Sequence, residues 1–286
     1  MQTISSNYHK PVKAIFALTV LFLFQATGIK LRAQETESLP WQQRDRQEMK
    51  PIEYEYVREA DVMWSKNIWR VIDTRQKMNL PFSYPERPLI QVIHEAAKKG
   101  DITVYDASVL NADRFVKVLP LAEVQKMGEK NDTMMIIDVE NPDIERATPI
   151  NQPLTWDKIK KYRVKEVWFF DTKNSTMQAR IIAIAPVMED YDANGNYRGD
   201  MTMYWVPYAS LRNMLAKEEV FNPQSDAQRC SWEDLFEQRR FESYIYKESN
   251  VFDRNIQEYA SGVDAQLESD RIKQELFEKE HDLWNY

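Results

Sequence analysis

The amino-acid sequence predicts an α+β protein in which helices surround a central antiparallel β-meander at about residues 165–206. The first supporting observation is a set of three strand-like runs, Lys165–Asp171, Met177–Val187 and Met201–Val206, which turn-forming segments separate. The second is that helical and strand patterns alternate through the N-terminal half. The third is that the final third of the chain, after Pro207, has mostly helical periodicity.

Residues 1–33 have the features of a secretory signal peptide. Basic residues precede an apolar run from Ala14 to Phe24, and the small residue Ala33 is followed by Gln34. The apolar run is short for a permanent membrane helix, although an uncleaved membrane anchor is the alternative. We therefore expect cleavage between Ala33 and Gln34 and a soluble, exported product.

The composition argues against several classes of function. The 286 residues carry a net charge of -7, and removing residues 1–33 takes away four basic residues and no acidic one, so the exported chain has a charge of -11. Such an acidic chain does not favour nucleic acid as a partner. Six glycines without a glycine-rich phosphate loop disfavour nucleotide chemistry, and three histidines with one cysteine are too few for a structural zinc site. We expect no cofactor.

The exported chain is expected to begin with a polar arm over residues 34–53, which suits a tether more than a packed element. Beyond the arm, Trp64, Ile68 and Ile72 recur at four-residue spacing. This spacing is typical of an amphipathic helix, so a helix is predicted from Val57 to Met78.

Residues 54–140 as a whole are predicted to form a mixed α/β region. The further elements expected there are a helix at Leu89–Lys99, strands at Ile102–Tyr105 and Phe115–Val118, a helix at Leu121–Met127 and a strand at Met134–Val139. The segment Asn141–Pro153 holds three prolines and is the best candidate for a boundary. Residues 154–286 then contribute the meander and the C-terminal helices, either as a separate domain or as one domain with 54–140.

Three helices are predicted after the meander, at Leu211–Lys217, Trp232–Tyr246 and Val263–Trp284. The second of them has a start signal, because Ser231 and Asp234 stand at capping-box spacing. The C-terminal third is therefore expected to be mainly helical.

One local motif resembles a calcium loop. Asp190, Asp192 and Asn194, followed by Gly195, match the first half of the EF-hand pattern, but Met201 stands where a bidentate glutamate is required. Asp and Asn with glycine are also what a hairpin loop prefers. The three residues are weak candidate metal ligands, and a plain hairpin loop is the favoured interpretation.

Cys230 is the single thiol of the chain, so it has no partner for an internal disulfide. In an oxidising compartment an unpaired thiol sometimes links two chains. Cys230 is therefore a candidate for an intermolecular disulfide, and a buried or idle thiol is the alternative.

No catalytic constellation stands out in the sequence. No nucleophile motif accompanies the histidines that remain after export, so no catalytic residues are predicted. Neighbouring carboxylates occur at Glu189-Asp190, Glu218-Glu219, Glu233-Asp234 and Glu278-Glu280. Such pairs allow a carboxylate-dependent hydrolase acting on envelope glycans as the alternative function, although solvated surfaces explain them equally well in a chain with 45 acidic residues.

Aromatic residues point instead to protein interfaces. Eight Trp and fourteen Tyr are many for an acidic chain of this size, and such residues with arginine anchor interfaces. The candidate partner-binding residues are Trp64, Trp69, Arg70, Trp232, Phe236, Arg239, Arg240 and Phe241. The alternative is that these side chains fill a core between helices.

Four segments resemble a known family. They are VREADVMWSKNIWRVIDTRQKMNLPFSYP (Val57 to Pro85), RIIAIAPV (Arg180 to Val187), WEDLFEQRRFESYIYKESN (Trp232 to Asn250) and ESDRIKQELFEKEHDLW (Glu268 to Trp284). These motifs are similar to those of the GldN/PorN family of Bacteroidota, and the similarity extends over nearly all of the exported chain. The polar arm contains no motif of that family.

The resemblance implies a structural role in the type IX secretion system, which exports proteins across the outer membrane and supports motility in gliding species. It implies many copies assembled with a GldK/PorK-like outer-membrane lipoprotein into a periplasmic ring under the outer membrane. It also implies contact with a GldM/PorM-like inner-membrane protein. A ring is a homo-oligomer built through heterologous contacts, so each subunit is expected to present two different binding surfaces.

Overall fold

The computed structural model describes the side chains of residues 49–108, 112–127, 156–192, 195–225, 227–279 and 281–282, and the backbone alone of 130–137, 145–152, 280 and 283. The predicted signal peptide, its cleavage site at Ala33 and Gln34, and most of the arm lie outside the described residues. Arg46–Tyr286 forms a compact unit.

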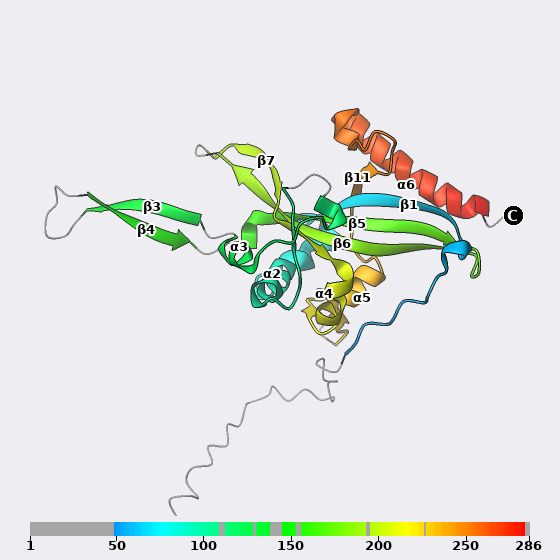
Figure 1. Ribbon diagram of the computed structural model, residues 1–286, viewed down its shortest axis with the longest axis horizontal. Helices are drawn as coiled ribbons and strands as arrows, with labels where there is room; N and C mark the ends of the chain where they lie inside the picture. Colours follow the sequence, from blue (N-terminus) through cyan, green and yellow to red (C-terminus); the bar gives the residue numbers. More distant parts are fainter. Residues whose placement is uncertain are drawn as a thin grey trace, which may run out of the picture. The chain divides into compact units, whose positions relative to one another are not determined.

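The centre of this unit is a seven-stranded antiparallel sheet (Figure 1). Its order is β11-β1-β5-β6-β8-β2, and β7 also pairs with β6. The strands are β1 (Val62–Asp73), β2 (Tyr105–Asp106), β5 (Ile159–Asp171), β6 (Thr176–Tyr191), β7 (Tyr197–Thr202), β8 (Tyr204–Pro207) and β11 (Tyr244–Glu248). The α+β class and the antiparallel meander are thus confirmed, except that the third predicted strand is divided into β7 and β8.

The predicted helix at Val57–Met78 is wrong, because most of this segment is strand β1. Strand β1 lies between β5 and β11, with Ile72 opposite Tyr162. A spacing of four residues is also a multiple of the strand period of two, so Ile68 and Ile72 share one face of a strand as readily as one face of a helix. Pairing with two neighbouring strands determines the outcome.

Two further strand predictions are largely wrong. Of the predicted strand Ile102–Tyr105, only Tyr105 belongs to β2. Phe115 has a φ of 61°, which no strand residue adopts, and Val118 forms an isolated bridge to Tyr105. A left-handed backbone conformation at a phenylalanine has no signature in the sequence.

Two short antiparallel pairs complete the strands. Strands β3 (Lys130–Ile137) and β4 (Glu145–Gln152) pair with each other, and β9 (Glu219–Val220) pairs with β10 (Cys230–Ser231). The predicted strand Met134–Val139 overlaps β3, and its last two residues lie outside the described ones.

One face of the sheet packs against helices α2 (Leu89–Lys99), α4 (Tyr208–Leu215) and α5 (Trp232–Glu237), which lie below the sheet in Figure 1. The predicted helix at Leu89–Lys99 is confirmed. The predicted one at Leu121–Met127 corresponds to α3 (Leu121–Lys126). The largest side chains of this main core are fully buried and include Phe82, Tyr162, Tyr204, Tyr208, Trp232 and Phe236.

The predicted helix at Trp232–Tyr246 is correct only at its start. The capping box of Ser231 and Asp234 is present and opens α5. The helix ends at Glu237 because Arg239 adopts the left-handed conformation, with a φ of 53°, that usually belongs to a glycine at this position. The chain then turns back and forms the edge strand β11.

Helix α6 (Val263–Leu283) confirms the prediction at Val263–Trp284, apart from Trp284, which lies outside the described residues. It runs beside β11 and β1 in Figure 1. Its residues Ile272 and Leu276 pack on Ile68 of β1 and Ile245 of β11. A second, smaller core therefore lies under α6.

The chain just before β1 is fastened to the surface of this unit. The Arg212 side chain of α4 donates a hydrogen bond of 2.5 Å to the carbonyl oxygen of Ile52. The same guanidinium lies 3.9 Å from the centre of the Tyr54 ring, and Arg180 lies 4.7 Å from it. The Tyr54 hydroxyl donates to Glu237 of α5. We call residues 52–55 the strap.

Candidate functional site

A groove of about 920 Å³ between α6 and the segment that joins α5 to β11 is a candidate binding surface. Strands β1 and β5 form its base. We call it the α6 groove, and its principal lining residues are Arg70, Met78, Trp168, Arg239, Phe241, Leu276 and Phe277.

A buried carboxylate organises the base of this groove. Glu166 is fully buried, and it accepts hydrogen bonds from Arg70 at 3.0 Å, from Arg239 at 2.8 Å and from the indole of Trp168 at 2.9 Å. Burial lowers the pKa of the Arg70 guanidinium from its ordinary value, and the negative charge of Glu166 opposes that change. Two cations share one carboxylate, so this cluster carries an excess positive charge.

The two arginines also enclose an aromatic ring. The guanidinium carbons of Arg70 and Arg239 lie 5.6 Å and 5.2 Å from the centre of the Trp168 ring. Cation–π contacts of this kind fix both the arginines and the tryptophan in place. The base of the groove is therefore preorganised.

The rim of the groove is apolar and exposed. Met78 is 57% exposed and Phe277 is 66% exposed. Large apolar side chains around a charged base are typical of a surface that binds another protein.

Asn79 holds the wall of the groove. It is fully buried, and its amide donates hydrogen bonds of 2.8 Å to the carbonyl oxygens of Asp73 and Glu242, while its own oxygen accepts from the Glu242 amide. The end of β1 is thereby joined to the segment that precedes β11.

The eight interface candidates from the sequence are divided among four places. Arg70, Arg239 and Phe241 meet in the α6 groove. Trp64 is half-buried in a neighbouring pocket along α6, beside Ile272. Trp69 lies on the opposite face of the sheet, in a smaller pocket.

The remaining three candidates are structural in this arrangement. Trp232 and Phe236 are each 1% exposed in the main core, which matches the alternative that they fill the space between helices. Arg240 donates a hydrogen bond to the sulfur of Cys230. Cys230 is a buried thiol, so a disulfide to another chain would require the β9–β10 segment to open.

The calcium-like motif lies at the turn between β6 and β7. Asp192 accepts hydrogen bonds from the backbone and side chain of Asn196, which closes the turn, and Asp190 lies 3.7 Å from Arg198. Asn194 lies outside the described residues. Among the described residues, no group of three His, Cys, Asp or Glu side chains is arranged to hold a metal ion.

Several of the carboxylates that allow a hydrolase are engaged in structural contacts. The ion pairs are Glu189 with Arg75, Glu218 with Arg87, Glu219 with Arg229 and Glu233 with Arg212, while Asp234 caps α5. Burial raises the pKa of the Glu233 carboxyl, although Arg212 opposes this change. These contacts give the hydrolase alternative no support.

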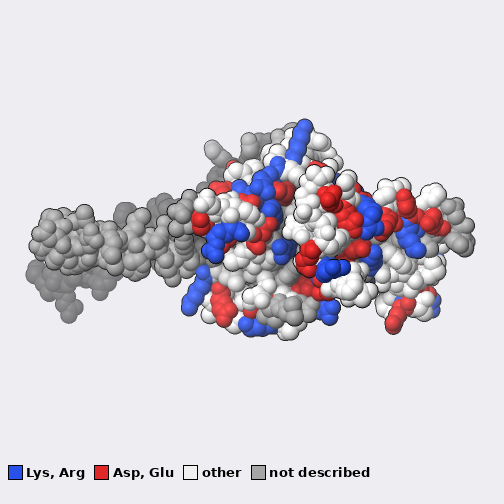
Figure 2. Space-filling model, turned by 90° about the horizontal axis from the view of Figure 1, so that it is seen from above, with Lys and Arg blue, Asp and Glu red and all other residues white. Residues whose placement is uncertain are grey.

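Charged side chains of both signs are interspersed over the face shown in Figure 2. A surface that binds nucleic acid through its phosphates would instead gather positive charge in a patch or stripe.

Within the described part of the chain, no helix has the length and apolar character required to cross a membrane.

Sequence reasoning missed four principal lining residues of the α6 groove, Met78, Trp168, Leu276 and Phe277, and also Glu166 at its base. Glu166 and Trp168 are two residues apart in a strand-like run, so their common face was readable from the sequence. A charged residue at the core-facing position of such a run is the available signal for a buried ion pair.

Comparison with known proteins identifies the family. No curated protein matches this chain. The family model described as "Gliding motility associated protein GldN" matches residues 57–285, a span that contains all of the α6 groove. This family supplies structural components of the gliding motility and type IX secretion machinery. The chain belongs to the GldN family of gliding motility associated proteins.

Proposed function

We propose that this chain is a non-catalytic structural subunit of the type IX secretion machinery that acts in the periplasm. It assembles in many copies with a GldK/PorK-like outer-membrane lipoprotein into a ring under the outer membrane. It also contacts a GldM/PorM-like inner-membrane protein and is needed for protein export, and for gliding in species that glide.

The observation that carries this proposal is the family match over residues 57–285. The α6 groove agrees with it, since its base is rigid and cationic while its rim presents Met78 and Phe277 to solvent. Interfaces of stable complexes are built from such aromatic and arginine anchors.

The α6 groove is proposed to receive the lipoprotein partner. A groove of about 920 Å³ holds a segment of a protein, such as a helix or a loop with apolar side chains. Attachment through this groove would keep the subunit at the outer membrane without a lipid of its own.

Coexpression with the lipoprotein tests the proposal. The lone chain is expected to be aggregation-prone or unstable, and the coexpressed pair is expected to elute from a size-exclusion column as one large, soluble assembly. Electron microscopy of that peak should show rings. A lone chain that stays a well-behaved monomer and does not copurify with the lipoprotein would refute the ring proposal.

A matched pair of variants tests the groove. Phe277→Glu places a charge on its apolar rim, and Phe252→Glu places the same charge on another exposed phenylalanine, which is 72% exposed. Phe277→Glu is expected to reduce copurification of the lipoprotein at least tenfold, whereas Phe252→Glu leaves it unchanged. Equal effects of the two variants would exclude the groove as the docking site.

Deletion of the gene tests the role in the cell. Cells without the protein should retain the cargo of the secretion system in the periplasm, and the Phe277→Glu variant should restore export less well than the Phe252→Glu variant. Normal export in the deletion strain would contradict the proposed function.

A further inference from the structure

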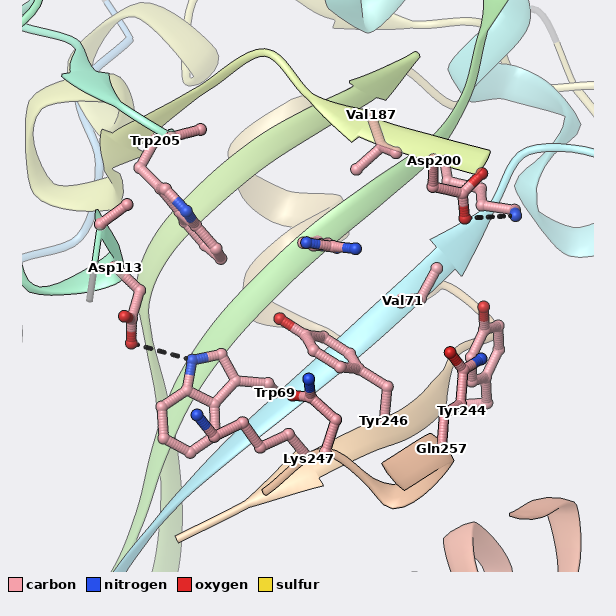
Figure 3. A pocket seen from close by; sticks show the side chains of 15 residues that line it. Trp69, Val71, Asp113, Val187, Asp200, Trp205, Tyr244, Tyr246, Lys247 and Gln257 are labelled. Carbon is pink, nitrogen blue, oxygen red and sulfur yellow. Dashed lines mark hydrogen bonds and ion pairs between the residues drawn. The ribbon is translucent and has the colours of Figure 1, made fainter. Parts of the chain in front are cut away.

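A second pocket, of about 250 Å³, lies on the face of the sheet that α2, α4 and α5 do not cover (Figure 3). We call it the sheet pocket. Val71 of β1 and Arg163 of β5 are paired at its floor, and Ala185 of β6 is the next residue in the same row. The small side chains of Val71 and Ala185 leave room above the sheet on either side of Arg163.

Three cations project along β5 at two-residue intervals. The outer two form ion pairs, Lys161 with Asp200 at 2.7 Å and Lys165 with Asp113 at 2.9 Å. Arg163, between them, forms no ion pair with a carboxylate among the described residues. Its guanidinium lies 5.3 Å from the centre of the Tyr246 ring. Arg163 is attracted electrostatically to Asp200, but that carboxylate already forms its ion pair with Lys161.

The walls of the sheet pocket are aromatic and fixed. The Trp69 indole donates a hydrogen bond of 3.1 Å to Asp113, as Figure 3 shows, and the amino groups of Lys165 and Lys247 lie 5.3 Å and 4.9 Å from the centre of its ring. Trp205, which is 5% exposed, forms the opposite wall. A ligand group that enters here loses little free energy to rearrangement of the protein.

Size and charge define what the sheet pocket accepts. Its lining carries three cations, Lys161, Arg163 and Lys247, and two carboxylates, Asp113 and Asp200. Drug-sized ligands occupy roughly 300–1,000 Å³, so a pocket of about 250 Å³ suits one or two side chains. A guanidinium binds a carboxylate through two parallel hydrogen bonds, which makes a glutamate or aspartate side chain the best match.

The N-terminal arm contains a segment with matching periodicity. In an extended chain, Glu35, Glu37, Leu39 and Trp41 fall on one side at two-residue intervals. Successive side chains on that side are roughly 6.8 Å apart, which is also the spacing of Arg163 from its lysine neighbours on β5. The two carboxylates of this segment match the cations of the sheet pocket, and its two apolar side chains match the aromatic walls.

The strap favours binding between copies. Arg212 of α4 holds Ile52 and Tyr54, and α4 packs on the face of the sheet opposite the sheet pocket. The strap, which follows the arm in sequence, is therefore bonded on the face of the sheet opposite the sheet pocket. The eight residue-to-residue steps from Trp41 to Met49 span roughly 28 Å when extended, which is enough to reach an adjacent subunit.

We propose that Glu35–Trp41 of one copy binds in the sheet pocket of a neighbouring copy, with a glutamate carboxylate on Arg163. This inference rests on the proposed function in one respect, because it requires assembly in many copies. It supplies the heterologous contact that a closed ring needs: an arm on one side of each subunit and a pocket on the other.

Peptide binding tests the contact. The receptor is the full chain carrying Glu35→Gln and Glu37→Gln, so that its own arm does not compete, and the probe is a labelled, acetylated peptide of residues 34–43, followed by fluorescence anisotropy. Arg163→Leu in the receptor should weaken binding at least tenfold, and Arg163→Lys should weaken it less. Arg198→Leu, which changes an exposed arginine at the β6–β7 turn, should have no effect.

The same peptide with both glutamates replaced by glutamine tests the charge without altering the protein. It should bind at least tenfold more weakly, and the difference should decrease as salt is added. Equal affinities of the two peptides, or an affinity that Arg163→Leu leaves unchanged, would overturn the proposal.

Cysteine cross-linking distinguishes a neighbour's arm from the chain's own. One chain carries Ser38→Cys, and a second carries Gln257→Cys at the edge of the sheet pocket. Mixing the two and oxidising them mildly should give a covalent dimer between different chains. If a chain with both substitutions forms only an internal disulfide, the arm binds its own subunit and the proposal is wrong.

Failure of this inference is separable from failure of the proposed function. A chain that copurifies with the lipoprotein but does not bind the peptide loses only the arm contact. A chain that binds the peptide but ignores the lipoprotein retains the arm contact and refutes the proposed ring.

Discussion

A side-chain oxygen of Glu166 lies 2.8 Å from a terminal guanidinium nitrogen of Arg239, although 73 residues separate the two in sequence. Arg70 approaches the same carboxylate from β1. One buried negative charge therefore joins the middle of the sheet to the segment between α5 and β11, and it sets the base of the α6 groove.

Replacing Glu166 with glutamine should destabilise the fold by about 3–5 kcal/mol, because Arg70 is left as a buried cation beside a second uncompensated arginine. Urea unfolding followed by tryptophan fluorescence measures the change. Glu268→Gln is the matched control, since Glu268 pairs with Arg271 on the exposed side of α6 and should cost less than about 1 kcal/mol. Equal losses of unfolding free energy in the two variants would show that the buried cluster stabilises the fold no more than an exposed ion pair does.

Asn79→Ala should cost about 3 kcal/mol, because it leaves buried backbone groups of Asp73 and Glu242 without their hydrogen-bond partner. The groove wall should also loosen, which hydrogen exchange at residues 240–244 would detect as faster exchange. Asn222→Ala, at an exposed turn, is the control and should cost about 1 kcal/mol. Unchanged exchange in Asn79→Ala would contradict the assigned role of Asn79.

His94 should make the fold less stable in acid. Burial, assisted by the charge of Lys98, lowers the pKa of His94 to about 4 from an ordinary value of 6.5. As pH falls through that window, the unfolded chain binds a proton that the folded chain rejects, so stability decreases by about 3 kcal/mol in total. Above pH 6.5 this contribution is fully present.

The measurement compares urea midpoints of the wild type and His94→Gln between pH 7 and pH 4. The wild type should lose about 3 kcal/mol more than the variant across this range, because the variant lacks the titrating group. The His94 ring accepts or donates only one hydrogen bond, 3.2 Å to the Tyr204 hydroxyl, among the described residues. Parallel curves for the two proteins would show that His94 does not cause the acid sensitivity.

Phe236→Ala should destabilise the fold by roughly 3–5 kcal/mol, because the ring lies among Phe82, Tyr208 and Phe241 in the main core. Phe252→Ala, at an exposed ring, should change stability by less than about 0.5 kcal/mol. Thermal unfolding by circular dichroism separates these outcomes. A Phe236→Ala variant of normal stability that fails to assemble would instead place Phe236 in an interface.

Elements with local start and stop signals were predictable from the sequence. Helix α2 follows Pro88 and is capped at its C-terminal end by Gly100. The φ of Gly100 is 80°, a conformation that glycine adopts readily because it has no side chain. The capping box at Ser231 likewise marks the first residue of α5. These signals act within a few residues, so a single sequence contains them in full.

Strands whose pairing is distant in sequence were not predictable in the same way. Strand β1 is buried on both faces from Ile68 to Ile72, so its apolar residues, interrupted only by Arg70, form a run that does not distinguish strand from helix. Only its pairing with β5, nearly a hundred residues later, decides the structure. The left-handed backbone conformation of Arg239, which separates α5 from β11, depends on tertiary contacts as well.

The sequence predicted some residues of the α6 groove, but not the full set of residues that forms it. Arg70, Arg239 and Phe241 were expected to bind a partner and do share one groove. Glu166 was not expected. Its position in a strand-like run was a signal of burial, but only the pairing of β1 with β5 shows that this carboxylate, among 45 acidic residues, meets Arg70. Trp232 and Phe236 have the same residue types as interface anchors, and only the packing of α5 shows that they are internal.

The strap has a mechanical consequence. Tension on the chain before Met49 reaches Arg212 and Tyr54 first, because the strap is bonded to α4 and α5 ahead of β1. A pull of this kind is carried into the helices and does not peel β1 away from β5. A subunit that is pulled through its N-terminal arm would therefore keep its central sheet intact.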